Sequence, residues 1–406
     1  MLTKKTNYFR FELLSENEIA VNIVIFVDVS HNRFSEFHQL QQKVIEHMEK
    51  KRVKEQLKSD REPIRVGISL GDINGIGPEV IIKSFRDPQM LVECTPIIYG
   101  STKTIAIHKK AIDDNEFSYQ RIEDANQAQK RKVNIVACWK EVVEIQLGEA
   151  NETGGKYAFA SLEAATKDLA SGKIDVLVTA PISKETIQKA GFKFPGHTEY
   201  LAELSGVSDA LMMMVAGDLR VALVTSHISL KEVSNAITKE KVLDKLKAFD
   251  ASLKKDFGIV RPKIAVLGLN PHAGEKGKMG DEESEQITPA IQQAMGESIL
   301  AFGPYPADGF FGSRQYTQFD GVLAMYHDQG LTGFKSIAFN DGVNFTAGLP
   351  IVRTSPDHGT AFDIAGKGLA DEQSFRSAVY LAMDVYRTRS FVKEITANQL
   401  QSQDTK

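Results

Sequence analysis

The chain has 406 residues, of which 42% are hydrophobic and 25% charged, and its formal net charge is −4. These values are ordinary for a globular protein with a buried core, and the length allows two or three domains. The charge balance argues against partners that are recognised through a basic field, such as nucleic acid or an anionic membrane.

The first 62 residues differ from the rest of the chain. The stretch 20–30, AVNIVIFVDVS, predicts a strand, and the highly charged stretch 46–63 predicts a solvated helix or a linker. The apolar run within 23–27 is too short for a signal peptide, and no small-x-small cleavage site follows it. We interpret residues 1–62 as an N-terminal extension without a catalytic pattern.

The rest of the chain contains no apolar run that approaches the roughly 20 residues of a membrane helix. The two cysteines, Cys94 and Cys138, are far apart and lie in apolar, strand-like runs. This pattern favours reduced thiols in a cytoplasmic protein, and it excludes a thiolate zinc site because no Cys-x-x-Cys spacing occurs.

Apolar strands alternate with helices from residue 63 onward. Strands are predicted at 64–69, 95–100, 133–137, 174–181, 220–227, 263–272 and 321–328. Helices are predicted at 80–85, 156–173, 238–255, 283–299 and about 371–388. Continuously apolar strands separated by helices are typical of a mainly parallel sheet with both faces covered, so the predicted class is α/β.

A glycine-rich turn, GDINGIGPE (71–79), follows the first of these strands. It lacks the Gly-Lys-Ser/Thr ending of a phosphate-binding P-loop, and the spacing of Gly71, Gly75 and Gly77 is not Gly-x-Gly-x-x-Gly. The turn therefore indicates close backbone approach, and any dinucleotide would be bound without the usual Rossmann fingerprint.

Three predicted strands end in a histidine: His227 follows RVALVTS, His272 follows KIAVLGLNP, and His327 follows GVLAMY. The carboxyl ends of strands in an open α/β sheet are where ligands bind. Neighbouring strands would bring the three imidazoles together as a site for a divalent cation. The alternative is that each is an ordinary loop histidine, and the pattern alone leaves both readings open.

Other polar residues suggest anion binding. His197 and Thr198 follow Gly196 in FPGHTEY, where a turn opening a helix offers N–H groups, a hydroxyl and an imidazole, and His358 lies in a similar turn. Lys335, Asn344 and Arg353 follow His327 and could bind a phosphate or carboxylate near a metal. Taken singly, such turns are more often helix caps, and such cations are more often surface charges.

Together these motifs resemble the 4-hydroxythreonine-4-phosphate dehydrogenase family of pyridoxal phosphate biosynthesis. The resemblance covers about residues 64–388 and rests on GDINGIGPE, FPGHTEY, VALVTSH, GLNPHAGE, AMYHDQGL and GVNFTAGLPIVRTSPDHGTAFDIAG. It implies two α/β/α domains with mainly parallel sheets and a central cleft, similar to isocitrate and isopropylmalate dehydrogenases. The expected domains are 63–185 plus 340–390 and 186–339, followed by a tail at 391–406.

The resemblance also implies site residues. His227, His272 and His327 match the family's ligands for a divalent metal, which could be zinc, magnesium, cobalt or manganese. The matches to substrate-binding positions are His197, Thr198, Lys335, Asn344 and Arg353. The expected assembly is a homodimer whose site is completed by both subunits. The family commonly has Pro-Gly-Asp-Pro-Ala-Gly where this chain has residues 70–75, and we assign no residue to the NAD cofactor.

The implied reaction is the NAD- and metal-dependent oxidation of 4-phosphooxy-L-threonine, with decarboxylation to 3-amino-2-oxopropyl phosphate. Asp328 and Lys335 are candidates for the catalytic base because they flank a predicted metal ligand. Asp328 is alternatively a partner that orients a histidine. Two other functions remain open: oxidation of a four-carbon sugar-acid phosphate, such as threonate or erythronate 4-phosphate, and a non-redox metal-binding role on the same scaffold.

Overall fold

The computed structural model describes residues 7–13, 21–27, 62–207 and 210–397. The chain divides into two compact units, Met1–Glu62 and Pro63–Lys406. In the first unit, strands β1 (Asn7–Leu13) and β2 (Val21–Val27) pair antiparallel. The strand predicted within 20–30 is therefore confirmed, whereas nearly all of the charged stretch 46–63 lies outside the described residues.

The second unit is built on one 12-stranded sheet with the order β11-β10-β12-β9-β8-β13-β14-β7-β3-β4-β6-β5. Its strands are β3 (Ile64–Ser69), β4 (Cys94–Gly100), β5 (Gln120–Ile122), β6 (Asn134–Ala137), β7 (Val176–Thr179), β8 (Leu211–Ala216), β9 (Leu219–Leu223), β10 (Lys263–Leu267), β11 (Leu300–Tyr305), β12 (Gly321–Ala324), β13 (Val343–Ala347) and β14 (Arg353–Pro356). Most neighbouring strands are parallel, which confirms the predicted α/β class.

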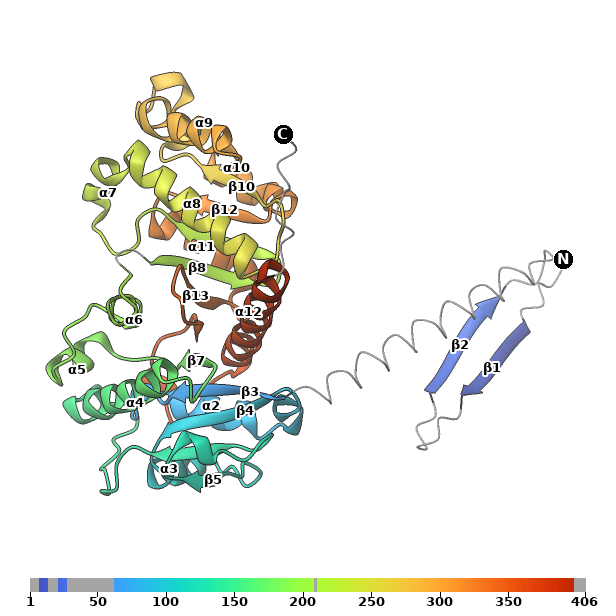
Figure 1. Cartoon of the computed structure of the whole chain (residues 1–406), viewed down its shortest axis with the longest axis vertical. Coiled ribbons are helices and arrows are strands. Elements are labelled where there is room, and N and C mark those ends of the chain that lie inside the picture. Colours follow the sequence, from blue (N-terminus) through green and yellow to red (C-terminus); the bar gives the residue numbers. More distant parts are fainter. Residues whose placement is uncertain (1–6, 14–20, 28–61, 208–209, 398–406) are drawn as a thin grey trace, which may run out of the picture. The chain divides into compact units, whose positions relative to one another are not determined.

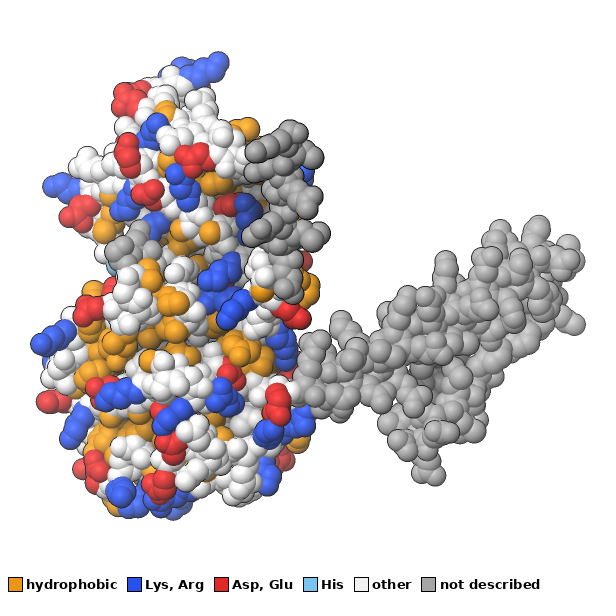
Figure 2. Space-filling view, viewed as in Figure 1, with side chains coloured by type: hydrophobic (Ala, Val, Ile, Leu, Met, Phe, Trp, Pro, Cys, Tyr) orange, Lys and Arg blue, Asp and Glu red, His pale blue; other side chains and the backbone are white. Residues whose placement is uncertain are grey.

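The helices lie along this sheet (Figure 1). They are α2 (Gly77–Phe85), α3 (Thr102–Ala111), α4 (Glu152–Ala170), α5 (Lys184–Lys189), α6 (His197–Leu204), α7 (Leu230–Ala236), α8 (Lys239–Lys255), α9 (Thr288–Gly296), α10 (Ala307–Gly312), α11 (His327–Ala338) and α12 (Gln373–Ala397). None of the helices among the described residues is both long and apolar enough to cross a lipid bilayer. On the face drawn in Figure 2, acidic and basic side chains are interspersed.

The two predicted sheets are joined into one. Antiparallel pairs β8–β9, β13–β8 and β13–β14 connect the strands of residues 186–339 to the remaining strands. Neither β8 nor the β13–β14 hairpin was predicted, because LMMMVA has no alternation and the segment 343–356 was interpreted only through its polar residues. The boundaries proposed for the two halves remain a prediction, although each half occupies a contiguous part of the sheet.

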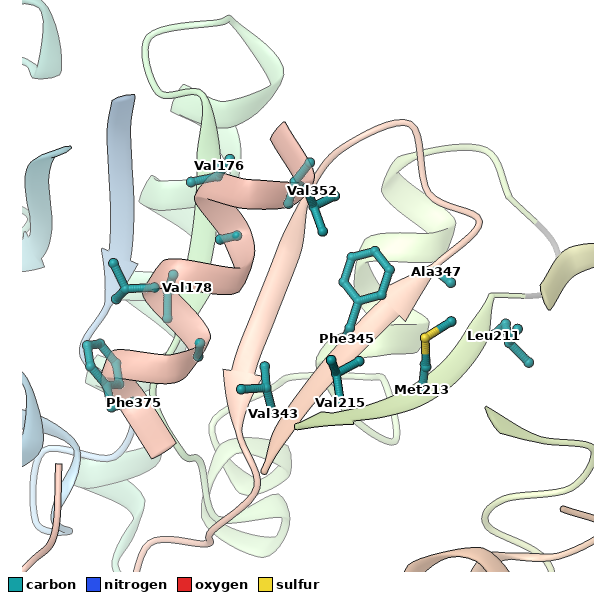
Figure 3. Packing of buried hydrophobic residues seen from close by; sticks show 14 of the residues in the cluster. Val176, Val178, Leu211, Met213, Val215, Val343, Phe345, Ala347, Val352 and Phe375 are labelled. Carbon is teal, nitrogen blue, oxygen red and sulfur yellow. The ribbon is translucent and has the colours of Figure 1, made fainter. Parts of the chain in front are cut away.

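Helix α12 covers one face of the central strands. Val176, Val178, Val343 and Phe345 point toward it and join a buried cluster with Phe375 of the helix (Figure 3). Because strand side chains alternate between faces, the intervening residues of β7, β13 and β14 point to the opposite face. Those residues are largely polar, and this alternation places them where a ligand could contact them.

The predicted helices are present, but several of them begin or end at other residues than predicted. Helix α4 starts earlier than predicted because the Asn151 side chain accepts a hydrogen bond from the Gly154 N–H and caps it. The stretch 283–299 is interrupted: a π-helical turn at Glu283–Ile287 precedes α9, and β11 starts at Leu300. The last helix continues to Ala397, so residues 391–397 of the predicted tail are helical.

Candidate functional site

A cavity lies on the sheet face opposite α12, between the end of β7, the start of α6, β13 and the segment 353–359. Its lining residues include four that the sequence selected for substrate binding, namely His197, Thr198, Asn344 and Arg353, together with His227 and His358. Residues separated by more than 150 positions therefore meet on one face of the sheet.

Arg353 is the most deeply buried cation of this cavity, with 2% of its surface exposed. Its Nη2 and Nε donate to the Thr179 hydroxyl at 2.7 and 3.1 Å, and its Nη1 donates to the Thr346 hydroxyl at 3.2 Å. Burial lowers the pKa of Arg353 to about 10, so the group stays charged at neutral pH. It forms no ion pair with a carboxylate among the described residues; the nearby Glu199 charge favours its charged form, and the buried guanidinium is a candidate contact for an anion.

His197 contacts the same guanidinium. Its Nδ1 lies 3.2 Å from Arg353 Nη2, and burial together with the nearby Arg353 charge holds the pKa of His197 well below 6.5. Because arginine can only donate, Nδ1 of the neutral ring must accept, and the proton sits on Nε2. That Nε2 is buried and has no partner. His197 therefore presents an unused N–H donor beside Arg353.

The start of α6 adds further donors. Gly196, the N-cap residue, is extended and provides no side-chain cap, so the first N–H groups of α6 lack a side-chain acceptor. Glu199 in the first turn brings a carboxylate near Gly196, and Lys184 lines the same cavity. The site thus combines four kinds of donor, namely a helix N-terminus, a lysine, a buried arginine and an imidazole N–H. This set of donors suits a phosphate or a carboxylate.

Two acceptor atoms without hydrogen-bond partners among the described residues belong to side chains that line the same cavity. The Oδ1 atom of Asn344 is buried without a partner. His358 uses Nδ1 to donate to the Gly359 carbonyl at 3.1 Å, which leaves its buried Nε2 as an unpaired acceptor. Burial lowers the pKa of His358 and favours this neutral form. The cavity can thus bind a molecule that carries both an anionic group and hydrogen-bond donors.

Two of the three strand-end histidines lie close together. Strands β10, β12 and β9 are adjacent and parallel, as the histidine pattern required. The ring centroids of His227 and His327 are 6.0 Å apart. Two imidazoles on one tetrahedral ion place their centroids about 5 Å apart, since each metal–nitrogen bond is about 2 Å long. Burial and the Lys184 charge lower the pKa of His227, which favours the neutral form that binds metals.

The third histidine does not join this pair. The side chain of His272 is 65% exposed, and its Nδ1 lies 3.8 Å from the carboxylate of Glu275. No group of three histidine, cysteine or acidic side chains suited to a metal ion occurs among the described residues. The donor set of one chain therefore fits a metal through His227 and His327 and is incomplete without another ligand.

The two candidates for the base have different surroundings. The Asp328 carboxylate is 83% exposed and accepts a hydrogen bond from His327 Nδ1 at 2.7 Å, which leaves Nε2 free to bind a ligand. Lys335 Nζ forms an ion pair with Asp357 at 3.2 Å, and Asp357 lines the cavity. Burial raises the pKa of Asp357, and Lys335 opposes that shift.

The glycine-rich turn packs against its own chain. A Cβ at Gly71 would come within 2.2 Å of the Pro181 carbonyl oxygen, and one at Gly75 within 2.8 Å of the Thr360 oxygen. The buried Asp72 carboxylate accepts from the Asn74 N–H and the Thr186 hydroxyl. The glycines thus allow close backbone packing, as the spacing indicated, and the turn is filled by internal contacts.

Sequence reasoning did not select Thr179, Lys184 or Asp357. Thr179 ends the apolar strand β7, so the rule that found the histidines could have found it. Asp357 stands beside His358 in a motif that was quoted, and its role becomes visible only through the Lys335 contact. Lys184 begins a short helix, and nothing in the neighbouring sequence indicates that it lines a cavity.

Three comparisons relate this chain to known proteins. Residues 92–382 match the family model described as pyridoxal phosphate biosynthetic protein PdxA. A Bacteroides thetaiotaomicron protein named 4-hydroxythreonine-4-phosphate dehydrogenase is 52% identical over 85% of this chain and 94% of its own length. A putative D-threonate 4-phosphate dehydrogenase from Oceanobacillus iheyensis is 41% identical over 81% of this chain and 99% of its own.

A solved structure agrees with these matches. The crystal structure of 4-hydroxythreonine-4-phosphate dehydrogenase from Klebsiella pneumoniae has a TM-score of 0.71 and 34% sequence identity, and the match covers 81% of this chain and 99% of that chain. The similarity extends over nearly the whole of that protein.

Proposed function

Because this chain belongs to the PdxA family of pyridoxal phosphate biosynthetic proteins, we propose that it oxidises 4-phosphooxy-L-threonine as a 4-hydroxythreonine-4-phosphate dehydrogenase. In this reaction NAD accepts a hydride from the C3 carbon, and the resulting β-keto acid loses CO₂ to give 3-amino-2-oxopropyl phosphate. The pathway served would be pyridoxal 5′-phosphate biosynthesis.

The buried Arg353 is the observation that carries this proposal. A charged guanidinium without an ion-pair partner among the described residues is costly in the interior unless a ligand supplies the anion. The Nε2–H of His197 and the N-terminus of α6 lie beside it and add donors with the same preference. We infer that this end of the cavity binds the substrate phosphate, with Thr198 as a further contact.

The acceptors fit the rest of the same substrate. A 4-phosphooxy-L-threonine molecule carries an ammonium group and a hydroxyl, both of which donate hydrogen bonds. Asn344 Oδ1 and His358 Nε2 are buried acceptors without partners in the same cavity. Lys335, held by Asp357 at the cavity wall, would balance the substrate carboxylate.

We propose that His227 and His327 bind the divalent cation through Nε2. Their ring separation of 6.0 Å is close to the spacing of two imidazoles on one ion, and Asp328 fixes the orientation of the His327 ring. When bound, such a cation would lower the pKa of the substrate hydroxyl and polarise the carbonyl formed from it. Of the four cations that the resemblance allows, zinc suits imidazole donors, whereas magnesium and manganese prefer oxygen ligands.

The missing third ligand supports a shared site. His272 is 65% exposed and forms no three-ligand group with His227 and His327 among the described residues, which is compatible with a residue that serves another subunit. We propose a homodimer in which each exposed His272 completes the metal site of the partner. We further propose that Asp328 orients His327 and that the hydroxyl proton leaves through Lys335 or water.

The alternative substrate is a four-carbon sugar-acid phosphate. The relative from Oceanobacillus iheyensis, named for D-threonate 4-phosphate, favours this second candidate because it is 41% identical. Such a substrate has the same phosphate but a hydroxyl in place of the ammonium group. Both groups donate to Asn344 and His358, so the cavity's hydrogen-bonding pattern suits either one.

A substrate panel tests the proposal. The full chain is incubated with NAD, Co²⁺ and one of three compounds: 4-phosphooxy-L-threonine, D-threonate 4-phosphate or D-erythronate 4-phosphate. We expect NADH absorbance to rise with the highest kcat/KM on 4-phosphooxy-L-threonine. A higher kcat/KM on either sugar-acid phosphate would assign the alternative, and no NADH from any of them would overturn the dehydrogenase assignment.

A further inference from the structure

The three loops that carry the histidines are connected by side-chain hydrogen bonds. Between the loops of His227 and His327, the Thr225 hydroxyl donates to the Met325 carbonyl at 2.8 Å, and the Thr225 N–H donates to the same oxygen at 3.1 Å. Thr225 and Met325 each stand two residues before a histidine. This contact therefore fixes the relative position of the two segments that follow β9 and β12.

Gln329 makes the corresponding connection between β12 and β10. Its Oε1 accepts from the Met325 N–H at 2.7 Å, and its Nε2 donates to the Gly268 carbonyl at 2.5 Å. One amide group thus joins the start of the His327 loop to the start of the His272 loop. Both of its polar ends are used, so its position is set by two backbone groups on different strands.

The His272 loop needs such external support. His272, Ala273, Glu275 and Lys276 all have positive φ values, between 41° and 58°, a region that side-chain-bearing residues rarely adopt. Glu283 supports the other side of this loop: its carboxylate accepts from the Asn270 N–H at 2.7 Å and from Asn270 Nδ2 at 2.9 Å. Glu283 itself is buried, on the π-helical turn before α9.

We propose that Gln329 is a positioning residue for the metal sites, which holds the His272 loop in the position from which His272 reaches the site of the partner subunit. Glu283 is its counterpart on the far side of that loop. Both act on residues that precede His272: Gln329 on the Gly268 carbonyl, and Glu283 on the backbone N–H and side-chain amide of Asn270. This inference rests on the proposed metal-binding role of the three histidines.

The test uses Gln329→Met, which keeps the length of the side chain and removes both hydrogen bonds. Gln286→Met is the matched control, because Gln286 is also half-buried and accepts from a backbone N–H, that of Lys239 at the start of α8, and its side chain makes no hydrogen bond to residues 268–277, all of which the structure describes. Co²⁺ is titrated into the full chain without substrate, and binding is followed by the visible absorbance of the ion. His327→Ala defines the signal that depends on the histidines.

We expect Gln329→Met to weaken Co²⁺ binding about 10-fold, at the lower end of the 10- to 100-fold losses typical of groups that orient metal ligands. Gln286→Met should bind Co²⁺ within twofold of the unaltered chain. Glu283→Gln should weaken binding in the same direction as Gln329→Met. In the metal-free protein, amide hydrogens of residues 268–277 should exchange faster in Gln329→Met than in Gln286→Met.

The outcomes separate the inference from its premise. If the unaltered chain binds Co²⁺ and Gln329→Met binds it equally well with the same spectrum, the positioning role is wrong and the metal site stands. If the unaltered chain shows no Co²⁺ binding that depends on His327, the metal assignment is wrong. The positioning role of Gln329 is then wrong as well, because it depends on that assignment.

Discussion

A buried guanidinium distinguishes the cavity at the scale of single residues. Arg353 spans Thr179 and Thr346 with three N–H groups and still faces the cavity. With the contact to His197 Nδ1, four of its five N–H groups are used, which leaves one Nη1–H for a phosphate; a lysine ammonium, with three donors, could not keep all these contacts. The exact side chain at this position should therefore matter for substrate binding beyond its charge.

Arg353→Lys should raise the KM for the phosphorylated substrate by about 10- to 100-fold, the range expected from losing charge-assisted hydrogen bonds of about 1.5–3 kcal/mol. Steady-state kinetics at saturating NAD provide the measurement. Arg65→Lys is the control, because Arg65 pairs with Asp175 rather than with cavity residues. Equal KM values for Arg353→Lys and the unaltered chain would remove Arg353 from the phosphate site.

Asp328 permits a separate test of orientation against proton transfer. The Asp328 carboxylate is exposed and accepts a hydrogen bond from His327 Nδ1. Asp328→Asn should keep most of the activity, because the amide oxygen can accept the same hydrogen bond. Asp328→Ala should lower kcat/KM by about 10-fold. The pH–rate profile should keep its shape in both variants. Loss of the acidic limb in Asp328→Asn would identify Asp328 as the base instead.

Several residues of the cavity were accessible from the sequence. Gly196 followed by His197 and Thr198 predicts a helix start with free donors, and α6 begins at His197. The partnership of His197 with Arg353 was not predictable, because it depends on how β14 lies against α6. The exposure of His272 was also not predictable, because no sequence pattern indicates positive φ values at four residues with side chains, from His272 to Lys276.

At the scale of elements, the packing of α11 against β9 and β12 holds His327 in place. Gly330, in the first turn of α11, has no room for a side chain: a Cβ would meet Leu223 Cδ2 at 2.8 Å and Ala324 Cβ at 3.0 Å. Those neighbours belong to the two strands that carry His227 and His327. A larger residue would push the start of the helix away from the sheet.

Gly330→Ala should lower the free energy of unfolding by about 1–3 kcal/mol, the usual cost of overpacking, and should weaken Co²⁺ binding as well. Urea unfolding measures the first effect. Gly309→Ala in α10 is the control, since a Cβ there meets no atom within 4 Å and alanine favours a helix. A Gly330→Ala protein as stable as Gly309→Ala would show that α11 adapts without strain.

His108 links α3 to the glycine-rich turn and gives the stability a pH dependence. Its Nε2 bonds the Ile73 carbonyl at 2.8 Å, and burial lowers the pKa of His108 to about 4. The unfolded chain takes up this proton near pH 6.5 and the folded chain only near 4. The stabilisation is therefore present above pH 6.5 and is lost as the pH falls toward 4.

His108→Gln should make the loss of stability between pH 6.5 and 4 smaller by up to about 3 kcal/mol, the free energy that corresponds to a pKa lowered from 6.5 to about 4. Urea unfolding of both proteins across this pH range provides the comparison. Other buried histidines contribute equally to both proteins and cancel in the difference. Parallel curves would mean that His108 is protonated without unfolding.

The strand pattern predicted part of the site's architecture. Apolar strands ending at His227, His272 and His327 predicted three adjacent parallel strands, and β9, β12 and β10 have this arrangement. The same pattern could not reveal that the substrate cavity lies on a sheet face, because that face is made by β13 and β14. Those strands alternate polar and apolar residues over only a few positions, and their polar residues were assigned to binding rather than to strands.

At the scale of the whole molecule, one continuous sheet carries both parts of the site. The end of the cavity that we propose binds the phosphate lies over β7, β13 and β14, and the histidine pair lies just beyond the ends of β9 and β12. The antiparallel junction through β8 joins these regions into one structure. The sequence resemblance implied two domains and a cleft, but a junction formed by β8 and β13 depends on contacts that no local pattern encodes.

Shared metal sites predict complementation between subunits. His272→Ala and His327→Ala should each be inactive alone. Unfolding and refolding them together should restore about a quarter of full activity, because half the dimers are mixed and one of their two sites keeps all its ligands. NADH formation in the mixture provides the measurement. No recovery, with mixed dimers verified by mass, would show that each chain supplies all its own ligands.

The most direct test is a crystal of the full chain grown with Co²⁺ and 4-phosphooxy-L-threonine, measured at the cobalt absorption edge. Our account predicts an anomalous peak bonded to His227 and His327 Nε2, with the substrate phosphate against Arg353, His197 and the start of α6 in the same cavity. A cobalt peak away from both histidines, or a phosphate outside the cavity, would contradict it.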